Sequence, residues 1–126
     1  MNAIKAKTYA PIILRIGIAI VFMWFGYHQL ISQTMWISLI PHWMILLTGM
    51  SARTLVVING VFEVLMSLLL IFGYRLRTVG ILLSLHLLMI ICDVGLSAIG
   101  MRDIGLMFAT ISIALYGADA HSVDRH

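Results

Sequence analysis

The stretch that decides the fold is Leu55-Val-Val-Ile-Asn-Gly-Val-Phe-Glu-Val-Leu-Met-Ser-Leu-Leu-Leu-Ile-Phe-Gly73. At 1.5 Å per residue, a helix over this run is long enough to cross a hydrocarbon core of about 30 Å. Glu63 lies near its middle, where an ionised carboxylate is costly. Asn59 precedes Glu63 by one turn on the same helical face. The helix must therefore turn this face inward, give Glu63 a partner, or keep it protonated.

The composition is that of an integral membrane protein. The 126 residues are 62% hydrophobic and 10% charged, whereas a soluble domain carries about 25% charged residues. We expect one membrane domain, 1–126, without a soluble module. The first apolar segment is too long for a signal peptide, so we predict that it is a span. Cys92 is the single cysteine, which excludes an internal disulfide and a dithiol redox mechanism within this chain.

The apolar runs predict an all-α, antiparallel bundle of four transmembrane helices. The predicted helices are about 12–31, 55–73, 79–97 and 103–117. Between the first two, Ser32–Arg53 contains Pro41 and only a short apolar run. Because Pro breaks a helix and the run is too short to span, we predict an interfacial or re-entrant segment across the outer mouth of the bundle.

Finer features of the first three helices follow from single residues. Pro11 suits the first turn of the first helix, where its missing N–H costs nothing. Arg15 lies near the membrane entry, so we expect its side chain to snorkel to the headgroups. The tight turn Tyr74–Thr78 predicts that the second and third helices form an antiparallel hairpin.

The C-terminal part gives three further predictions. The helix expected from about Asp103 is short for a span, and Asp103 suits its N-terminus because acidic residues favour that end. Small residues give this helix a face for close packing; they are Gly105, Ala109 and Ser112. The polar tail Gly117–His126 is expected to be frayed.

Four spans place both termini on one side, and the basic residues are biased toward that side. It collects Lys5, Lys7, Arg15, Arg75, Arg77 and Arg125, against Arg53 and Arg102 on the other. The positive-inside rule then predicts a multi-pass protein of the cell (plasma) membrane with both termini cytoplasmic. The net charge of +3 thus reports orientation in a lipid bilayer, and we expect no nucleic-acid partner.

Polar residues form a predicted column from the membrane centre to the outer face. Its members are Glu63, His86, Asp93, Asn59, His28, Arg102 and Asp103. They favour a ligand or quinone pocket or a proton path, the usual meaning of ionisable residues at membrane depth. They are equally compatible with structural pairs, in which Glu63 bonds His86 or His28 and Asp93 pairs with Arg102.

A metal or haem site is the weakest interpretation of this column. His28 and His86 are the only histidines predicted at membrane depth, and their depths differ by several residues. Axial ligands of haem need matched depths, so we predict no metal site.

Several motifs together resemble the DoxX family of small membrane proteins, from Arg15 to Gly117. They are Arg15-Ile-Gly17, Phe22-Met-Trp-Phe-Gly26, Trp36 with Pro41-x-Trp43, Gly60-Val-Phe-Glu63, Leu70-Ile-Phe-Gly73, Arg75-x-Arg77 and Arg102-Asp-Ile-Gly-Leu106. The resemblance implies a four-helix membrane bundle. Its namesake is associated with a membrane thiosulfate:quinone oxidoreductase, and other members with redox or oxidative-stress complexes.

The resemblance also implies which positions carry function. Glu63, Arg102 and Asp103 match recurrent family residues. Where many members carry a lysine near the end of the first helix, this chain has Gln29 beside His28 and so lacks that fixed positive charge.

We therefore expect a membrane subunit of a larger redox complex, not a self-sufficient enzyme, with no intrinsic cofactor and with quinone as its ligand. Glu63 would exchange a proton, His86 or Asp93 would relay it, and the ligand would meet a binding set. That set is His28, Asn59, Arg102 and Asp103. The alternative is a non-catalytic accessory subunit that stabilises a membrane oxidase or oxygenase. A homo-oligomer is also compatible with the sequence. A small-solute carrier is disfavoured because the sequence shows no inverted repeat.

Overall fold

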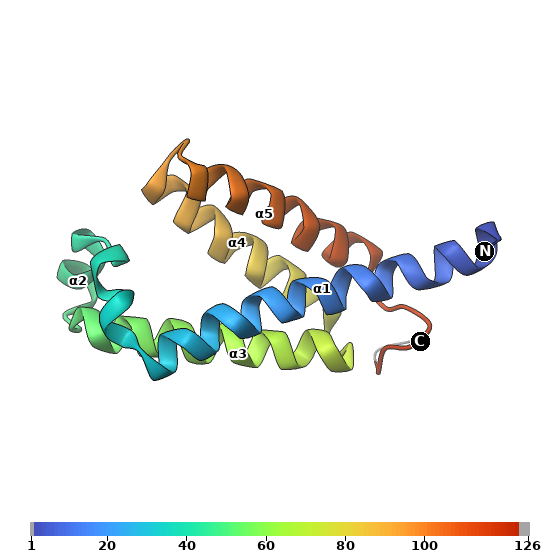
Figure 1. Cartoon of the computed structure of the whole chain (residues 1–126), viewed down its shortest axis with the longest axis horizontal. Coiled ribbons are helices and arrows are strands. Elements are labelled where there is room, and N and C mark those ends of the chain that lie inside the picture. The colour runs from blue at the N-terminus through green and yellow to red at the C-terminus, as the bar shows by residue number, and fades with distance from the viewer. Residues whose placement is uncertain (1, 124–126) are drawn as a thin grey trace.

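The computed structural model describes residues 2–123, and within them it is all-helical. Four helices there are long and apolar enough to cross a membrane, as the sequence predicted. They are α1 (Ala3–Ile31), α3 (Ala52–Phe72), α4 (Leu76–Val94) and α5 (Ala98–Tyr116). Both ends of the described chain lie at one end of the bundle (Figure 1). We call this the terminal end and the opposite one the loop end.

The long helices pack as two pairs, α1 with α3 and α4 with α5 (Figure 1). Glycines permit the first contact, because a Cβ at Gly26 would lie 2.9 Å from the carbonyl oxygen of Gly60. In the second pair, a Cβ at Gly80 would lie 2.8 Å from the Cβ of Ala114. Small residues at such crossings let helix backbones approach closely.

This pairing corrects two expectations. A tight turn does join α3 to α4, but the two helices diverge from it and each packs mainly on another partner (Figure 1). The close face of α5 is also only in part the predicted one: Ala109 packs against the core, but nothing lies within 4 Å of a Cβ built at Gly105. The contact to α4 uses Thr110 and Ala114 instead.

Residues 32–51, the connecting segment, lie across the loop end (Figure 1). They form two short 3₁₀ turns, η1 (Gln33–Met35) and η2 (Ile37–Leu39), and the helix α2 (His42–Thr48). Pro41 precedes α2 with an extended backbone. With seven residues, α2 is far too short to span a bilayer, which agrees with the predicted interfacial or re-entrant segment.

The helix starts differ from the predicted ones because side chains cap them earlier. Asn2 caps α1 by accepting from the N–H of Lys5, so Pro11 lies inside the helix and not in its first turn. Ser97 caps α5 by accepting from the N–H of Gly100. Helix α5 therefore has 19 residues, enough for a span, and Asp103 lies in its second turn.

Residues 117–123 are not frayed, contrary to expectation. They fold back over the terminal end, where Asp119 and Ser122 are buried and the N–H of Val123 donates to the carbonyl of Phe72. A Cβ on Gly73, which caps α3 with φ +73°, would collide with Ser122. The predicted frayed stretch also includes 124–126, which lie outside the described residues.

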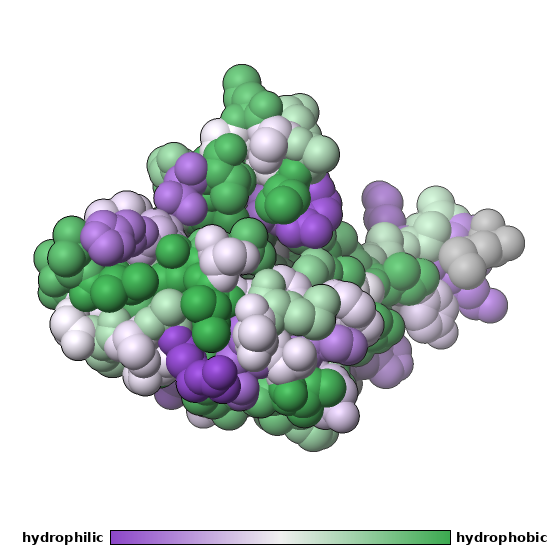
Figure 2. Space-filling model, turned by 60° about the vertical axis from the view of Figure 1, so that its left-hand side comes forward, coloured by the Kyte–Doolittle hydropathy of each residue, from purple (hydrophilic) through white to green (hydrophobic). Residues whose placement is uncertain are grey.

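The surface is apolar where a soluble protein would be charged. Figure 2, with the loop end turned toward the viewer, shows hydrophobic residues over much of the surface and hydrophilic ones in separate patches. Large side chains such as Leu65, Leu85 and Phe108 are 52%, 58% and 62% exposed. A contiguous apolar surface of this kind is suited to lipid.

Candidate functional site

Glu63 is the centre of a buried polar cluster at the loop-end half of the bundle. The residue is 4% exposed. Asn59 Nδ2 donates to Glu63 Oε1 over 3.0 Å and to Gln29 Oε1 over 2.7 Å. Gln29 Nε2 lies 3.4 Å from Glu63 Oε2. We call Gln29, Asn59, Glu63 and His86 the Glu63 cluster.

His86 connects this cluster to the other helix pair. Its Nε2 lies 3.2 Å from Glu63 Oε1, and its side chain is 9% exposed. The ring also packs on Phe62, with centroids 5.0 Å apart. Because His86 comes from α4 and Glu63 from α3, this contact is one of the polar bonds between the two pairs.

A cavity of about 550 Å³ lies beside the cluster, between the helix pairs and under the connecting segment. Its volume falls within the range of about 300–1,000 Å³ typical of small-molecule sites. The wall is largely apolar and aromatic; the aromatic members are Phe22, Phe25, Trp36, Trp43 and Phe62. The polar members are Gln29, Asn59, Glu63, His86, Asp93, Arg102 and Asp103. We call it the loop-end cavity.

Arg102 and Asp103 form the side of the cavity contributed by α5. Arg102 Nη2 lies 3.1 Å from Asp103 Oδ1, with 49% of the Arg102 side chain and 4% of the Asp103 side chain exposed. The guanidinium also lies over the ring of Phe25, 5.1 Å from its centroid. A predicted structural pair is thereby corrected: Arg102 pairs with its neighbour Asp103, and Asp93 is exposed at the cavity wall.

The structure separates His28 from the other predicted site residues. His28 Nδ1 lies 2.8 Å from the carbonyl oxygen of Trp24, and its ring packs 4.1 Å from that indole. It is not among the residues that line the loop-end cavity. Helix geometry explains this, because the adjacent residue Gln29 points inward and takes the place next to Glu63.

Two residues of this site were not among the predicted ones. Gln29 was noted only as a departure from the family pattern, although an amide at membrane depth is itself a signal of an inward face. Trp36 lines the cavity, and its buried Nε1–H has no hydrogen-bond partner in the part of the chain that the structure describes. Its ring packs edge-on against Phe25, 5.8 Å away.

A second buried charge cluster lies at the terminal end. Arg15 is 3% exposed, and its Nε lies 2.7 Å from Asp119 Oδ2. Its Nη1 donates to the carbonyls of Leu70 and Ile71 at 2.7 and 2.8 Å. The expectation that Arg15 snorkels to the headgroups is thus wrong, because Asp119 folds back and supplies a carboxylate inside the protein.

The Asp119 carboxyl is held in its ionised form. Burial is the largest single influence and would raise its pKa, but hydrogen bonds from Arg15 and from the backbone N–H of His121 oppose it, and the pKa lies below its usual value of 3.8. Attraction to the charge of Arg15 acts in the same direction. This cluster is therefore a closed ion pair.

The protein-family comparison agrees with this fold. The family model for DoxX matches residues 10–96, which include most of α1 and all of the connecting segment, α3 and α4. No curated protein and no solved structure matches the chain. With four helices in residues 2–123 suited to membrane crossing and a family match over most of its length, this multi-pass membrane protein belongs to the DoxX family.

Proposed function

We propose that this chain is the small membrane subunit of a larger redox complex and that its loop-end cavity receives the headgroup of a quinone. The observation that carries the proposal is the position of the Glu63–His86 pair on the wall of an aromatic-lined cavity of about 550 Å³. A buried pair of titratable groups beside an apolar pocket is the usual setting of proton transfer.

The donor set fits a quinone in shape and in chemistry. A quinone headgroup is a flat apolar ring with carbonyl oxygens that accept hydrogen bonds. Phe25, Phe62 and Trp36 supply flat apolar walls. The Arg102 guanidinium, half exposed at the wall, supplies donors for the carbonyl oxygens. The Trp36 N–H, buried without a partner in residues 2–123, would supply a further donor once the indole turns toward the ligand.

A quinone bound here would accept two electrons and two protons and leave as the quinol; the electrons would come from a partner polypeptide that oxidises its own substrate. The chain's own residues would handle the protons. His86 and Glu63 share a hydrogen bond along which a proton moves between Nε2 and Oε1. Asn59 and Gln29 hold the carboxylate through two hydrogen bonds, and a third bond joins the two amides to each other. Asp93, exposed at the cavity wall, would exchange protons with the surroundings.

The basic residues biased toward the terminal end give the orientation within this proposal. Both termini would lie in the cytoplasm, and the loop-end cavity would be in the outer half of the plasma membrane.

The test compares Glu63→Gln with Arg53→Gln in the complex purified from native membranes in mild detergent. Arg53 is an exposed cation at the loop end that does not line the cavity. Decylubiquinone serves as the probe for binding and turnover. We expect Glu63→Gln to bind the probe but to lose turnover by roughly 10²-fold or more, the usual contribution of a positioned acid or base. Unchanged turnover per assembled complex would refute the proton role.

A second candidate function is a non-catalytic accessory subunit. The observation in its favour is that the Glu63 cluster is internally bonded, with each carboxylate oxygen meeting a donor from the chain itself. In this case Glu63→Gln would reduce the amount of assembled complex or its melting temperature, while turnover per assembled complex stays normal. Quantifying the complex by size-exclusion chromatography before the assay separates the two functions.

A further inference from the structure

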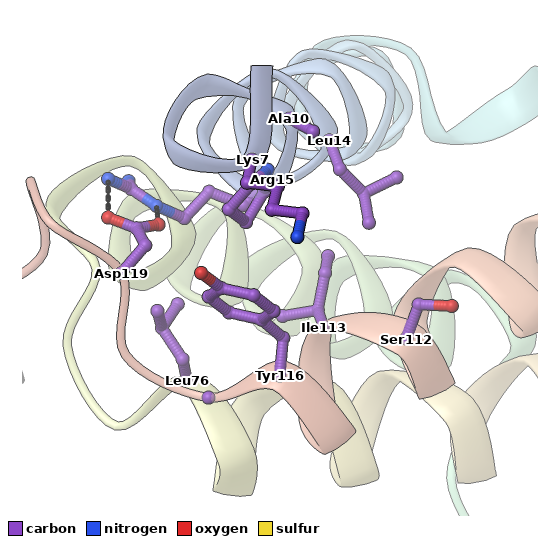
Figure 3. Close-up of a pocket in the computed structure, with 11 residues that line it drawn as sticks. Lys7, Ala10, Leu14, Arg15, Leu76, Ser112, Ile113, Tyr116 and Asp119 are labelled. Carbon is purple, nitrogen blue, oxygen red and sulfur yellow. Dashed lines mark hydrogen bonds and ion pairs between the residues drawn. The ribbon is translucent and has the colours of Figure 1, made fainter. Parts of the chain in front are cut away.

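A second cavity, of about 450 Å³, lies at the terminal end between α1 and α5 (Figure 3). It is remote from the Glu63 cluster and shares none of its residues. Lys7, Ala10 and Leu14 line it from α1, and Ile113 and Tyr116 line it from α5. We call it the terminal-end cavity.

The positive charge in this cavity comes from Lys7. The guanidinium of Arg15 is already occupied by Asp119 and by backbone carbonyls, so this ion pair adds no net charge. Lys7 is exposed on α1, about two turns from Leu14. In Figure 3 the side chains of Lys7 and Tyr116 extend from opposite helices into the gap. An ammonium and a phenol hydroxyl thus both reach into this cavity.

A second cation lies at the rim. A Cβ built on Gly117, a lining residue, would be 2.8 Å from Nε of Arg77. The guanidinium of Arg77 is therefore packed against the backbone that closes the cavity. With Lys7 in the lining and Arg77 beside Gly117, this part of the cavity favours an anion.

The deeper wall is apolar. Leu14 and Ile113 line it from opposite helices, with Ala10 between Leu14 and Lys7. From Lys7 to Leu14 the helix rises about 10 Å, so the cationic part and the apolar wall follow one another along the membrane normal. A phospholipid has the same order of phosphate and acyl chain.

We propose that the terminal-end cavity is a binding site for one anionic phospholipid, with its phosphate at Lys7 and Tyr116 and an acyl chain between Leu14 and Ile113. Basic pockets between transmembrane helices are suited to acidic headgroups. The site is independent of the quinone proposal, because it lies at the other end of the bundle.

The test is native mass spectrometry of the purified full chain with equal amounts of phosphatidylglycerol and phosphatidylcholine that carry identical acyl chains. We expect the chain to retain phosphatidylglycerol about five-fold over phosphatidylcholine, from the roughly 1 kcal/mol that one lysine contributes near an anionic lipid. Lys7→Gln should remove most of this preference, because only Arg77 beside Gly117 then remains. Lys5→Gln is the matched control, because Lys5 is exposed on the same helix but does not line the cavity.

Two further arms separate a lipid from a free phosphate and from general charge attraction. Ala10→Phe, at an exposed position that lines the cavity, should fill the apolar wall and lower lipid retention while Lys7 stays intact. Equal retention of the two lipids, or equal losses with Lys5→Gln and Lys7→Gln, would overturn the proposal. So would displacement of the lipid by millimolar inorganic phosphate combined with no effect of Ala10→Phe, because that result describes a phosphate site.

Discussion

At the terminal end, Arg15 is surrounded by carboxylate and carbonyl oxygens, whereas at the loop end Glu63 is surrounded by two amides and an imidazole. The first arrangement matches charge with charge and is covered by the folded-back tail. The second surrounds a carboxylate with neutral or titratable partners. Both clusters adjoin a cavity, of about 450 Å³ at the terminal end and about 550 Å³ at the loop end, so the difference lies in the partners of the charge. A closed ion pair fixes a structure, while a carboxylate with an imidazole partner on a cavity wall can exchange a proton.

The largest effect should come from removing one partner of the closed pair. Asp119→Ala leaves the buried Arg15 charge uncompensated, so we expect the free energy of unfolding to fall by about 3–5 kcal/mol. The measurement is reversible unfolding in mixed micelles. Arg53→Gln, at an exposed position, is the control and should change stability by less than about 0.5 kcal/mol. If Asp119→Ala lowered the free energy of unfolding no more than the control does, the Arg15–Asp119 pair would not be what stabilises the terminal end.

The double variant Arg15→Met/Asp119→Leu sharpens this test. Replacing a buried ion pair by apolar residues of similar volume is often neutral or stabilising. Here we expect only partial recovery, because Arg15 also satisfies the carbonyls of Leu70 and Ile71 at the end of α3. A double variant less stable than Asp119→Ala would contradict the assignment of the loss to an unpaired Arg15.

Acid should weaken the terminal end by less than the Asp119→Ala change does. The pKa of folded Asp119 lies below its usual value of 3.8, so the unfolded chain takes up the proton first as the pH falls. The stability from this carboxylate is therefore present above about pH 4 and is lost as the pH falls through the lowered pKa of the folded state. Unfolding followed from pH 6 to pH 3 should show this loss in wild type and not in Asp119→Asn. An identical slope in both proteins would assign the acid sensitivity to another group.

The loop end should be disturbed selectively by Gly60→Ala. A Cβ there would lie 3.0 Å from the carbonyl oxygen of Gly26 and 3.1 Å from the Cβ of Gln29, so α1 must shift and carry Gln29 away from Glu63. We expect a loss of about 1–3 kcal/mol, typical of overpacking, together with weaker decylubiquinone binding. Gly105→Ala is the matched control, since nothing lies within 4 Å, and should be neutral or stabilising by up to about 1 kcal/mol. If Gly60→Ala and Gly105→Ala changed stability and decylubiquinone binding equally, the close crossing of α1 and α3 would not be what holds the Glu63 cluster in place.

Local pattern was enough to predict the four helices and the inward face of Asn59 and Glu63. The one-turn spacing of these residues becomes a hydrogen bond of 3.0 Å. The Arg15–Asp119 pair joins residues 104 positions apart, and no periodicity within a helix reports such a contact. The inward orientation of Gln29 likewise depends on the close approach of Gly26 to Gly60, a property of two helices together.

The helix starts were predictable in part. Asn2 and Ser97 are residue types that commonly cap helices. Hydropathy alone does not identify them, because it locates the apolar run and not the polar residue that caps the helix. The start of α5 at Ala98 shows the consequence: Asp103 belongs to the helix interior, where its burial makes it a partner of Arg102 and not an N-terminal charge.

The smallest effect, and the most specific to the loop end, should come from Trp36→Phe. The indole Nε1–H is buried without an acceptor in residues 2–123, and an unsatisfied buried donor costs about 1–3 kcal/mol. Phenylalanine removes the donor and keeps an aromatic ring against Phe25, so we expect the ligand-free chain to gain about 1 kcal/mol. Decylubiquinone binding, measured by equilibrium dialysis, should weaken about five- to ten-fold, the cost of one lost hydrogen bond.

Trp43→Phe is the control for Trp36→Phe. Trp43 lines the same cavity but is 48% exposed. We therefore expect its substitution to change neither the stability nor the binding of decylubiquinone. A Trp36→Phe chain that is more stable and binds the quinone as well as wild type would mean that the donor serves no ligand; a chain that is less stable would mean that the ring, and not its N–H, holds the connecting segment over the cavity.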